Sequence, residues 1–80
     1  MIATIANHME QQKIIADFEA RATALGMSIG AICEEAGIHR TSFSRWKLSD
    51  KNPKPIGLTL HSLNKMNAAF ERLERSGVAA

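Results

Sequence analysis

Residues 28–47 read SIGAICEEAGIHRTSFSRWK, a pattern that indicates two short helices joined by a turn. The segment that follows a serine N-cap at Ser28 has apolar residues at helical spacing. It ends at Gly37, because glycine adopts the left-handed conformation that closes a helix without steric strain. Only residues 37–39 separate it from a second helical segment that starts near Arg40. Two short helices joined by so short a turn must cross at a steep angle, as in a helix-turn-helix.

The residues that this crossing would turn inward are all apolar. They are Ile32, Ala36, Ile38, Phe43 and Trp46. Cys33 is small and stands where the two helices should approach each other closely, so we interpret it as a core residue and not as a catalytic thiol. Trp46 lies three residues after Phe43 on the same side of its helix, which favours core packing over stacking on a base.

With these features the stretch resembles the helix-turn-helix of the Cro/cI-like repressor family, the lambda-repressor-like domains of phages and bacterial regulators. The residues that carry the resemblance are Cys33, Gly37, Ile38, Phe43 and Trp46. A basic loop with prolines and a further helix follow, so the resemblance covers roughly residues 14–75. Cys33 stands where the family more often has Ala, and His39 where it often has a Ser or Thr cap. The first residue of the second motif helix is therefore open between His39 and Arg40.

A long amphipathic helix is expected before the motif. Asn7 offers an N-cap with Glu10 as its capping-box partner, and Gly26 offers the stop. The apolar residues at helical spacing are Met9, Ile14, Ile15, Phe18, Ala22 and Leu25. We expect this set to face the core.

A fourth helix is expected after the motif. Thr59 is its predicted cap, with Leu58 and Leu63 as a hydrophobic staple. The residues that it should bury are Leu60, Leu63, Met66, Phe70 and Leu73. Residues 76–80 read as a flexible tail. The sequence therefore predicts an all-α, compact four-helix domain that occupies residues 1–80, with a long N-terminal helix and a helix-turn-helix at about residues 28–48.

Charge is distributed unevenly along the chain. Residues 1–39 carry a net charge of −3 and residues 40–80 carry +5, which gives +2 in total. Residues 40–54 alone hold a net charge of +4. They include the start of a loop that cannot be helical because it contains Pro53 and Pro55. So basic a segment is either a footprint for a polyanion or a solvated loop.

Helix geometry selects the candidate contact residues. If the second motif helix spans residues 40–48, a step of 100° per residue places Thr41, Ser44 and Arg45 opposite the buried aromatic side chains. The family resemblance implies base contacts from Arg40, Thr41 and Arg45. The residues of this chain that are predicted to read DNA bases are Arg40, Thr41, Ser44 and Arg45. The predicted phosphate-binding residues are Ser28, Lys47, Lys51, Asn52 and Lys54. Either arginine could instead contact phosphate alone.

Other function classes find little support. The single cysteine and the three histidines show neither C-x-x-C nor H-x-x-x-H spacing, and the chain has no phosphate-cradling glycine loop or nucleophile elbow. We therefore expect no metal site, no cofactor and no enzyme. No apolar run approaches the roughly 18 residues of a membrane span, and the N-terminus lacks the pattern of a signal peptide, so we expect a cytoplasmic protein.

Together these features predict sequence-specific binding of double-stranded DNA by a transcriptional regulator. The resemblance implies a phage-type Cro-like repressor or autorepressor that binds an inverted-repeat operator as a homodimer, with no small-molecule effector. Candidate dimer contacts are the apolar Ile2, Ile5 and Val78. Activation in place of repression stays open. The alternative class is an antitoxin-like or adaptor module that holds a protein partner with the same helical domain.

Overall fold

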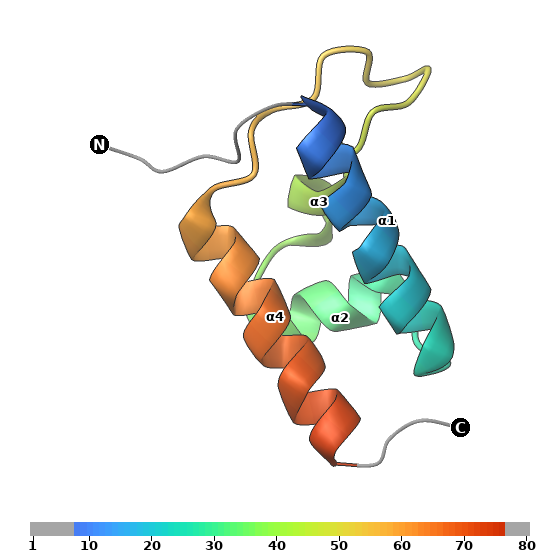
Figure 1. Cartoon of the computed structure of the whole chain (residues 1–80), viewed down its shortest axis with the longest axis vertical. Coiled ribbons are helices and arrows are strands. Elements are labelled where there is room, and N and C mark those ends of the chain that lie inside the picture. Colours follow the sequence, from blue (N-terminus) through green and yellow to red (C-terminus); the bar gives the residue numbers. More distant parts are fainter. Residues whose placement is uncertain (1–7, 77–80) are drawn as a thin grey trace.

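The computed structural model describes residues 8–76, and this part of the chain contains four helices joined by turns and a loop (Figure 1). They are α1 (His8–Ala24), α2 (Ile29–Ala36), α3 (Arg40–Trp46) and α4 (Leu60–Arg75). In Figure 1, α1 and α4 run in the same general direction, and α2 lies across the space between them and contacts both. The expected all-α four-helix fold with a long first helix is confirmed.

Several expectations fall outside the described residues. They concern the N-cap at Asn7, the apolar residues Ile2, Ile5 and Val78, and residues 77–80 of the tail. Ser76 is described, and its backbone N–H donates to the Arg72 carbonyl at 3.0 Å. Ser76 therefore closes α4 and does not belong to a tail.

The helix ends follow the residue types at the caps. Ser28 Oγ accepts the Ala31 N–H at 3.1 Å, and Thr59 Oγ1 accepts the Ser62 N–H at 3.2 Å, so both predicted N-caps are confirmed. After α1 the chain turns at Gly26, which has a φ of 68°. A side chain with a Cβ is strained in that conformation, and glycine is not.

The core is one cluster to which all four helices contribute. Its buried residues are Ile15, Phe18, Ala22, Leu25, Ile32, Cys33, Phe43, Trp46, Leu58, Met66 and Phe70. Ala36 and Ile38 are partly buried against it, so the inward positions predicted for the motif are confirmed. The Phe18 and Phe70 rings stack with centroids 5.5 Å apart and join α1 to α4.

Two residues predicted to be buried are exposed. Met9 is 75 % exposed and Leu60 is 47 % exposed. Each lies in the first turn of its helix, before the first apolar side chain of that helix that packs in or against the core, which is Ile14 in α1 and Leu63 in α4. Helical periodicity assigns a residue to a face of the helix, but it does not say how far along the helix the core extends.

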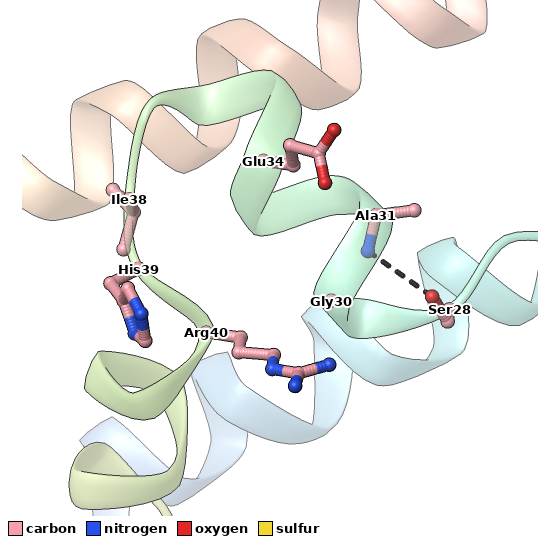
Figure 2. A pocket seen from close by; sticks show the side chains of 7 residues that line it. All are labelled: Ser28, Gly30, Ala31, Glu34, Ile38, His39 and Arg40. Atoms are coloured by element: carbon pink, nitrogen blue, oxygen red, sulfur yellow. Dashed lines mark hydrogen bonds between the residues drawn. The ribbon is translucent and has the colours of Figure 1, made fainter.

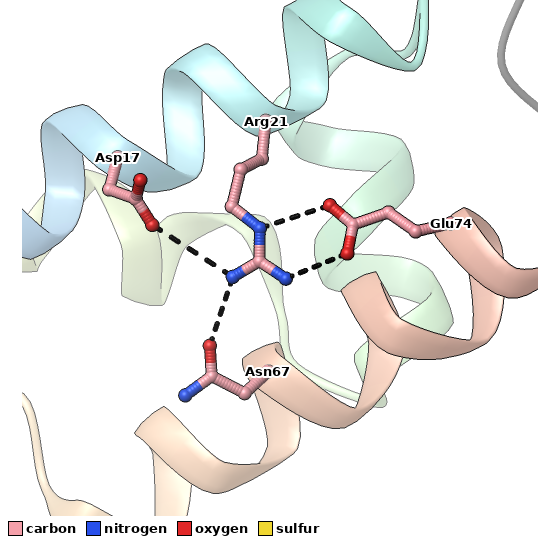
Figure 3. A network of polar contacts seen from close by, with 4 residues as sticks. All are labelled: Asp17, Arg21, Asn67 and Glu74. Atoms are coloured by element: carbon pink, nitrogen blue, oxygen red, sulfur yellow. Dashed lines mark hydrogen bonds and ion pairs between the residues drawn. The ribbon is translucent and has the colours of Figure 1, made fainter.

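One arginine joins α1 to α4 outside the core (Figure 3). Arg21 Nε and Nη2 donate to the two carboxylate oxygens of Glu74 at 3.1 and 3.0 Å, and Nη1 donates to Asn67 at 3.2 Å. The same guanidinium lies 4.4 Å from the centroid of the Phe70 ring. The hydrogen bonds from Arg21 hold the pKa of the Glu74 carboxyl below its usual range.

Candidate nucleic-acid interface

The start of α2 presents free backbone donors. The Ile32 N–H bonds the carbonyl of Ser28 and the Ala31 N–H bonds its side chain, both at 3.1 Å. The N–H groups of Ile29 and Gly30 belong to the first turn and have no carbonyl of the helix to bond. They lie at the positive end of the helix dipole, where an anion is stabilised.

The turn between α2 and α3 is fixed by its backbone. The Ile38 N–H donates to Cys33 O at 2.8 Å and the Gly37 N–H donates to Glu34 O at 3.1 Å. This pair of bonds is the Schellman arrangement, and it requires the left-handed conformation that Gly37 adopts with a φ of 73°. The angle at which α3 leaves α2 is thus set by residues 33–38.

His39 caps α3, so Arg40 is the first residue of that helix. His39 Nδ1 accepts the backbone N–H of Thr41 at 3.2 Å and lies 2.8 Å from Thr41 Oγ1. A ring nitrogen that accepts an N–H carries no proton, so the Thr41 hydroxyl is the donor in the shorter contact. The methyl group of Thr41 takes no part in this cap.

The two sides of α3 differ as helix geometry predicts. Phe43 and Trp46 are buried and meet edge to face with ring centroids 6.2 Å apart. Thr41, Ser44 and Arg45 are exposed. The structure therefore brings these three predicted base-reading residues together on the outward side of one short helix.

Arg40, the fourth predicted base-reading residue, lies at the start of α3 and lines a hollow together with Thr41 and Ser44. Figure 2 shows its side chain reaching from the start of α3 towards Ser28 at the start of α2. The Arg40 side chain passes beside Gly30, where an added Cβ would lie 3.8 Å from Arg40 Cδ, an ordinary van der Waals distance. Arg40 thus lines the hollow between the two helices together with Ser28, His39 and Glu34. This position suits a phosphate contact as well as a base contact.

Asn52 was predicted to contact phosphate, and its side-chain amide is used inside the protein. Nδ2 lies 3.0 Å from the Ser44 carbonyl oxygen and 2.9 Å from those of Arg45 and Lys47. The last carbonyls of a helix have no partner within it. Asn52 therefore supplies a donor to the C-terminal end of α3, which stops at Trp46, two residues before the predicted end.

A second amide side chain at this end comes from α1. Gln11 is only 4 % exposed, although it is polar. Its Nε2 donates to Trp46 O at 3.0 Å and to Ile56 O at 2.8 Å, and its Oε1 accepts the Leu58 N–H at 2.7 Å. One side chain of α1 thus binds the end of α3, the following loop and the residue before the cap of α4.

Gln12 adds a third amide. Its Nε2 donates to Trp46 O at 2.9 Å and its Oε1 accepts the Leu48 N–H at 3.1 Å. Sequence reasoning missed Gln11 and Gln12. Gln11 stands four residues before Ile15 on the apolar side of its helix, and a polar residue at such a position was the available sign of a buried hydrogen-bonding role.

The predicted basic residues divide into two groups. Lys47 Nζ contacts Glu19 of α1 at 2.5 Å, so its charge is already paired within the protein. Lys51 and Lys54 are exposed in the loop and form no ion pair among residues 8–76. Of the predicted phosphate contacts, these two lysines stay available, as does the hydroxyl hydrogen of Ser28, whose oxygen caps α2. Lys47 and Asn52 have structural partners.

Other chemistry gains no support from the described residues. Burial raises the pKa of the Cys33 thiol, which keeps it protonated and unreactive. Residues 8–76 contain no cluster of His, Cys, Asp and Glu that could hold a metal ion. In the same range, no helix has the length and apolar character that a membrane span requires.

No protein-family model, no curated protein and no solved structure matches the chain. The Cro/cI-like resemblance of residues 28–47 therefore stays a prediction from the sequence.

Proposed function

We propose that this chain binds double-stranded DNA sequence-specifically and regulates transcription as a phage-type Cro-like repressor or autorepressor. The observation that carries the proposal is the way in which α3 is presented. This helix has seven residues, too few to be stable in isolation. Its inward side is buried and both of its ends are capped by side chains from outside it, while Thr41, Ser44 and Arg45 are left exposed. A short rigid helix of this kind fits the major groove of DNA, which is about 12 Å wide.

Unpaired positive charge around α3 supports the same proposal. Arg21, Lys47 and Arg72 form ion pairs with carboxylates. In the described part of the chain, no carboxylate pairs with Arg40, Arg45, Lys51 or Lys54. Basic side chains that stay free of carboxylates are available to DNA phosphates and steer the domain towards them.

The residues around α3 suit different parts of a DNA site. The Arg45 guanidinium can bond both acceptors on the edge of a guanine, and the Thr41 methyl can contact the methyl group of thymine. Arg40 and the free N–H groups at the start of α2 suit a phosphate, as do Lys51 and Lys54. In this proposal Thr41, Ser44 and Arg45 read bases, and Arg40 contacts either a base edge or a phosphate. The lysines and the free N–H groups fix the register on the backbone.

Repression would follow from occupancy of the operator, because a bound domain excludes polymerase from the same DNA. Binding as a homodimer to an inverted repeat belongs to the proposal, with half-sites about one helical turn, or 34 Å, apart. An adaptor or antitoxin-like role is the competing proposal, and no described feature favours it specifically.

Selection of DNA from a random duplex pool tests the proposal directly. The full chain is immobilised, bound duplexes are amplified over several rounds and the enriched sequences are read. The expected result is one recurring sequence with two-fold symmetry, which gel shift then confirms as a high-affinity site. A pool that stays random after selection, with only weak and uniform binding, would rule out a sequence-specific regulator.

A further inference from the structure

Gln11 connects three segments of the chain near the C-terminal end of α3. Through one amide it contacts Trp46 at the end of α3, Ile56 in the loop and Leu58 before α4, at 3.0, 2.8 and 2.7 Å. No buried side-chain nitrogen or oxygen in the described residues lacks a hydrogen-bond partner. Gln11 therefore uses its amide nitrogen, which makes two hydrogen bonds, and its carbonyl oxygen, which accepts one, to hold these segments together.

The loop bound in this way carries the basic side chains of the candidate interface. Lys51 and Lys54 lie between Trp46 and Ile56, whose carbonyls accept the two hydrogen bonds from Gln11 Nε2. The loop is also tied directly to α3, because the Ile56 N–H donates to Arg45 O at 2.9 Å. Asn52, between the two lysines, adds contacts to the carbonyls of Ser44, Arg45 and Lys47. Contacts at the C-terminal end of α3 thus fix the position of the loop relative to the outward side of the helix.

We propose that Gln11 is a positioning residue for base recognition that acts through α3 without touching DNA. The proposal rests on the proposed function. Bidentate bonds to a base edge require the recognition helix within roughly 0.5 Å of its productive position. Contacts between flexible lysines and the repeating phosphates tolerate larger displacements. Loss of the Gln11 contacts should therefore weaken binding to the selected site far more than binding to unrelated DNA.

A second tie between α1 and α4 provides a matched control. Arg21 bonds Glu74 and Asn67 of α4, and among the described residues it forms no hydrogen bond or ion pair with α3 or the loop. Replacing Arg21 should loosen the helical bundle without releasing the end of α3. The comparison separates positioning of α3 from general stability.

The experiment compares Gln11→Leu, Gln11→Glu and Arg21→Gln with the unaltered full chain, each at a temperature where circular dichroism shows a folded protein. Affinities for the selected duplex and for a scrambled duplex are measured at one salt concentration. We expect the Gln11 variants to lose about tenfold or more in the ratio of the two affinities, a fraction of the 10³ to 10⁷ that specific sites typically show. Arg21→Gln should leave that ratio unchanged. An unchanged ratio in the Gln11 variants, or an equal fall in Arg21→Gln, overturns the proposal.

Hydrogen exchange on the unaltered chain tests the linkage without any variant, so the proposal stays testable if the Gln11 variants do not fold. The Leu58 amide, which donates to Gln11, should be protected as strongly as the core of α1. Exchange of this amide at the rate of an open loop overturns the positioning role even if DNA binding is specific. Failure of the unaltered chain to distinguish the two duplexes, with Leu58 protected, would instead count against the proposed function.

Discussion

The side-chain amide of Asn52 donates to the carbonyl oxygen of Arg45 at 2.9 Å, so a residue of the basic loop closes the last turn of α3. The same nitrogen lies within 3.0 Å of the Ser44 carbonyl and 2.9 Å of the Lys47 carbonyl. Asn52 is half-buried, while its neighbour Lys51 is exposed. Asn52 and Lys51 are adjacent and both belong to residue types that bind phosphate. Only the Lys51 side chain is free to do so, because the Asn52 amide already binds the carbonyls of α3.

Replacing Asn52 with alanine should destabilise the fold by about 1 to 2 kcal/mol, because the carbonyls of α3 lose their donor. Denaturant unfolding measures this loss. The salt dependence of DNA binding should keep its slope, since no phosphate contact is removed. Lys51→Ala is the matched control, and it should leave stability unchanged and reduce the salt slope by about 1. A smaller salt slope of DNA binding in Asn52→Ala would instead mean that Asn52 contacts a phosphate.

Two glycines of the motif should respond in opposite ways to alanine. Gly30 is the second residue of α2, and a Cβ there would make only ordinary contacts at 3.8 Å. Gly30→Ala should therefore stabilise the fold by about 0.5 to 1 kcal/mol, because alanine loses less backbone entropy in a helix. Gly37 has open space around it but a φ of +73°, so Gly37→Ala should destabilise by about 1 kcal/mol through backbone strain alone.

Thermal melts of the two glycine variants beside the unaltered chain check this pair. A melting temperature that falls in both variants would mean that the space at Gly30 is needed by Arg40. A melting temperature that rises in both variants would mean that alanine at position 37 causes no backbone strain.

The parts of the fold that depend on neighbours in sequence were predictable. The caps at Ser28 and Thr59 and the stop at Gly37 depend on side chains within a few residues, and each is as predicted. The outward position of Thr41, Ser44 and Arg45 follows from helix periodicity once Phe43 and Trp46 are taken as buried. Local rules therefore sufficed to find the motif and its exposed side.

The parts that depend on distant segments were not predictable from local rules. Gln11 and Trp46 are 35 residues apart, and the hydrogen bond between them is one of those that hold the end of α3. The ion pair between Lys47 and Glu19 likewise spans 28 residues, and it occupies a lysine that was predicted to contact phosphate. Residue type alone gave Lys47 and Lys54 the same role, and only the fold separates them.

Stability should depend on pH through Glu74. Its carboxyl pKa is lowered in the folded state below the ordinary 4.5, chiefly by the side-chain hydrogen bonds from Arg21. A carboxyl with a lowered folded pKa contributes its stability above the unfolded pKa and loses it as the pH falls through the folded pKa. The advantage of the unaltered chain over Glu74→Gln should therefore be present at pH 6 and shrink below about pH 4.5.

Urea midpoints of the unaltered chain and of Glu74→Gln across this range check the pH dependence. Because the pair is solvent-exposed, the difference at pH 6 should also shrink with added salt. Glu34→Gln is the control, since Glu34 is exposed and forms no ion pair in the described range. A difference between the chains that is equal at pH 3 and pH 6 would contradict the role of the Arg21 contact.

Arg45 and Lys54 should differ in what each contributes to DNA binding. Arg45 is exposed on the outward side of α3, and only its backbone carbonyl takes part in closing the helix, so Arg45→Ala should stay folded. It should lose about 1 to 3 kcal/mol of discrimination at particular base pairs of the selected site. Lys54→Ala should weaken binding to all duplexes alike and flatten the salt slope by about 0.9. Gel shifts with single-base variants of the site, repeated at several salt concentrations, measure both effects.

Arg45→Lys makes this comparison stricter, because lysine keeps the positive charge but cannot form the two parallel bonds of a guanidinium to a guanine edge. If Arg45 reads a base, the lysine variant should keep the salt slope of the unaltered chain and still lose discrimination at the same base pair as Arg45→Ala. If Arg45 only contacts phosphate, lysine should restore binding to every duplex. Uniform loss in Arg45→Ala, with full recovery in Arg45→Lys, would leave Ser44 and Thr41 as the remaining base-reading residues of α3.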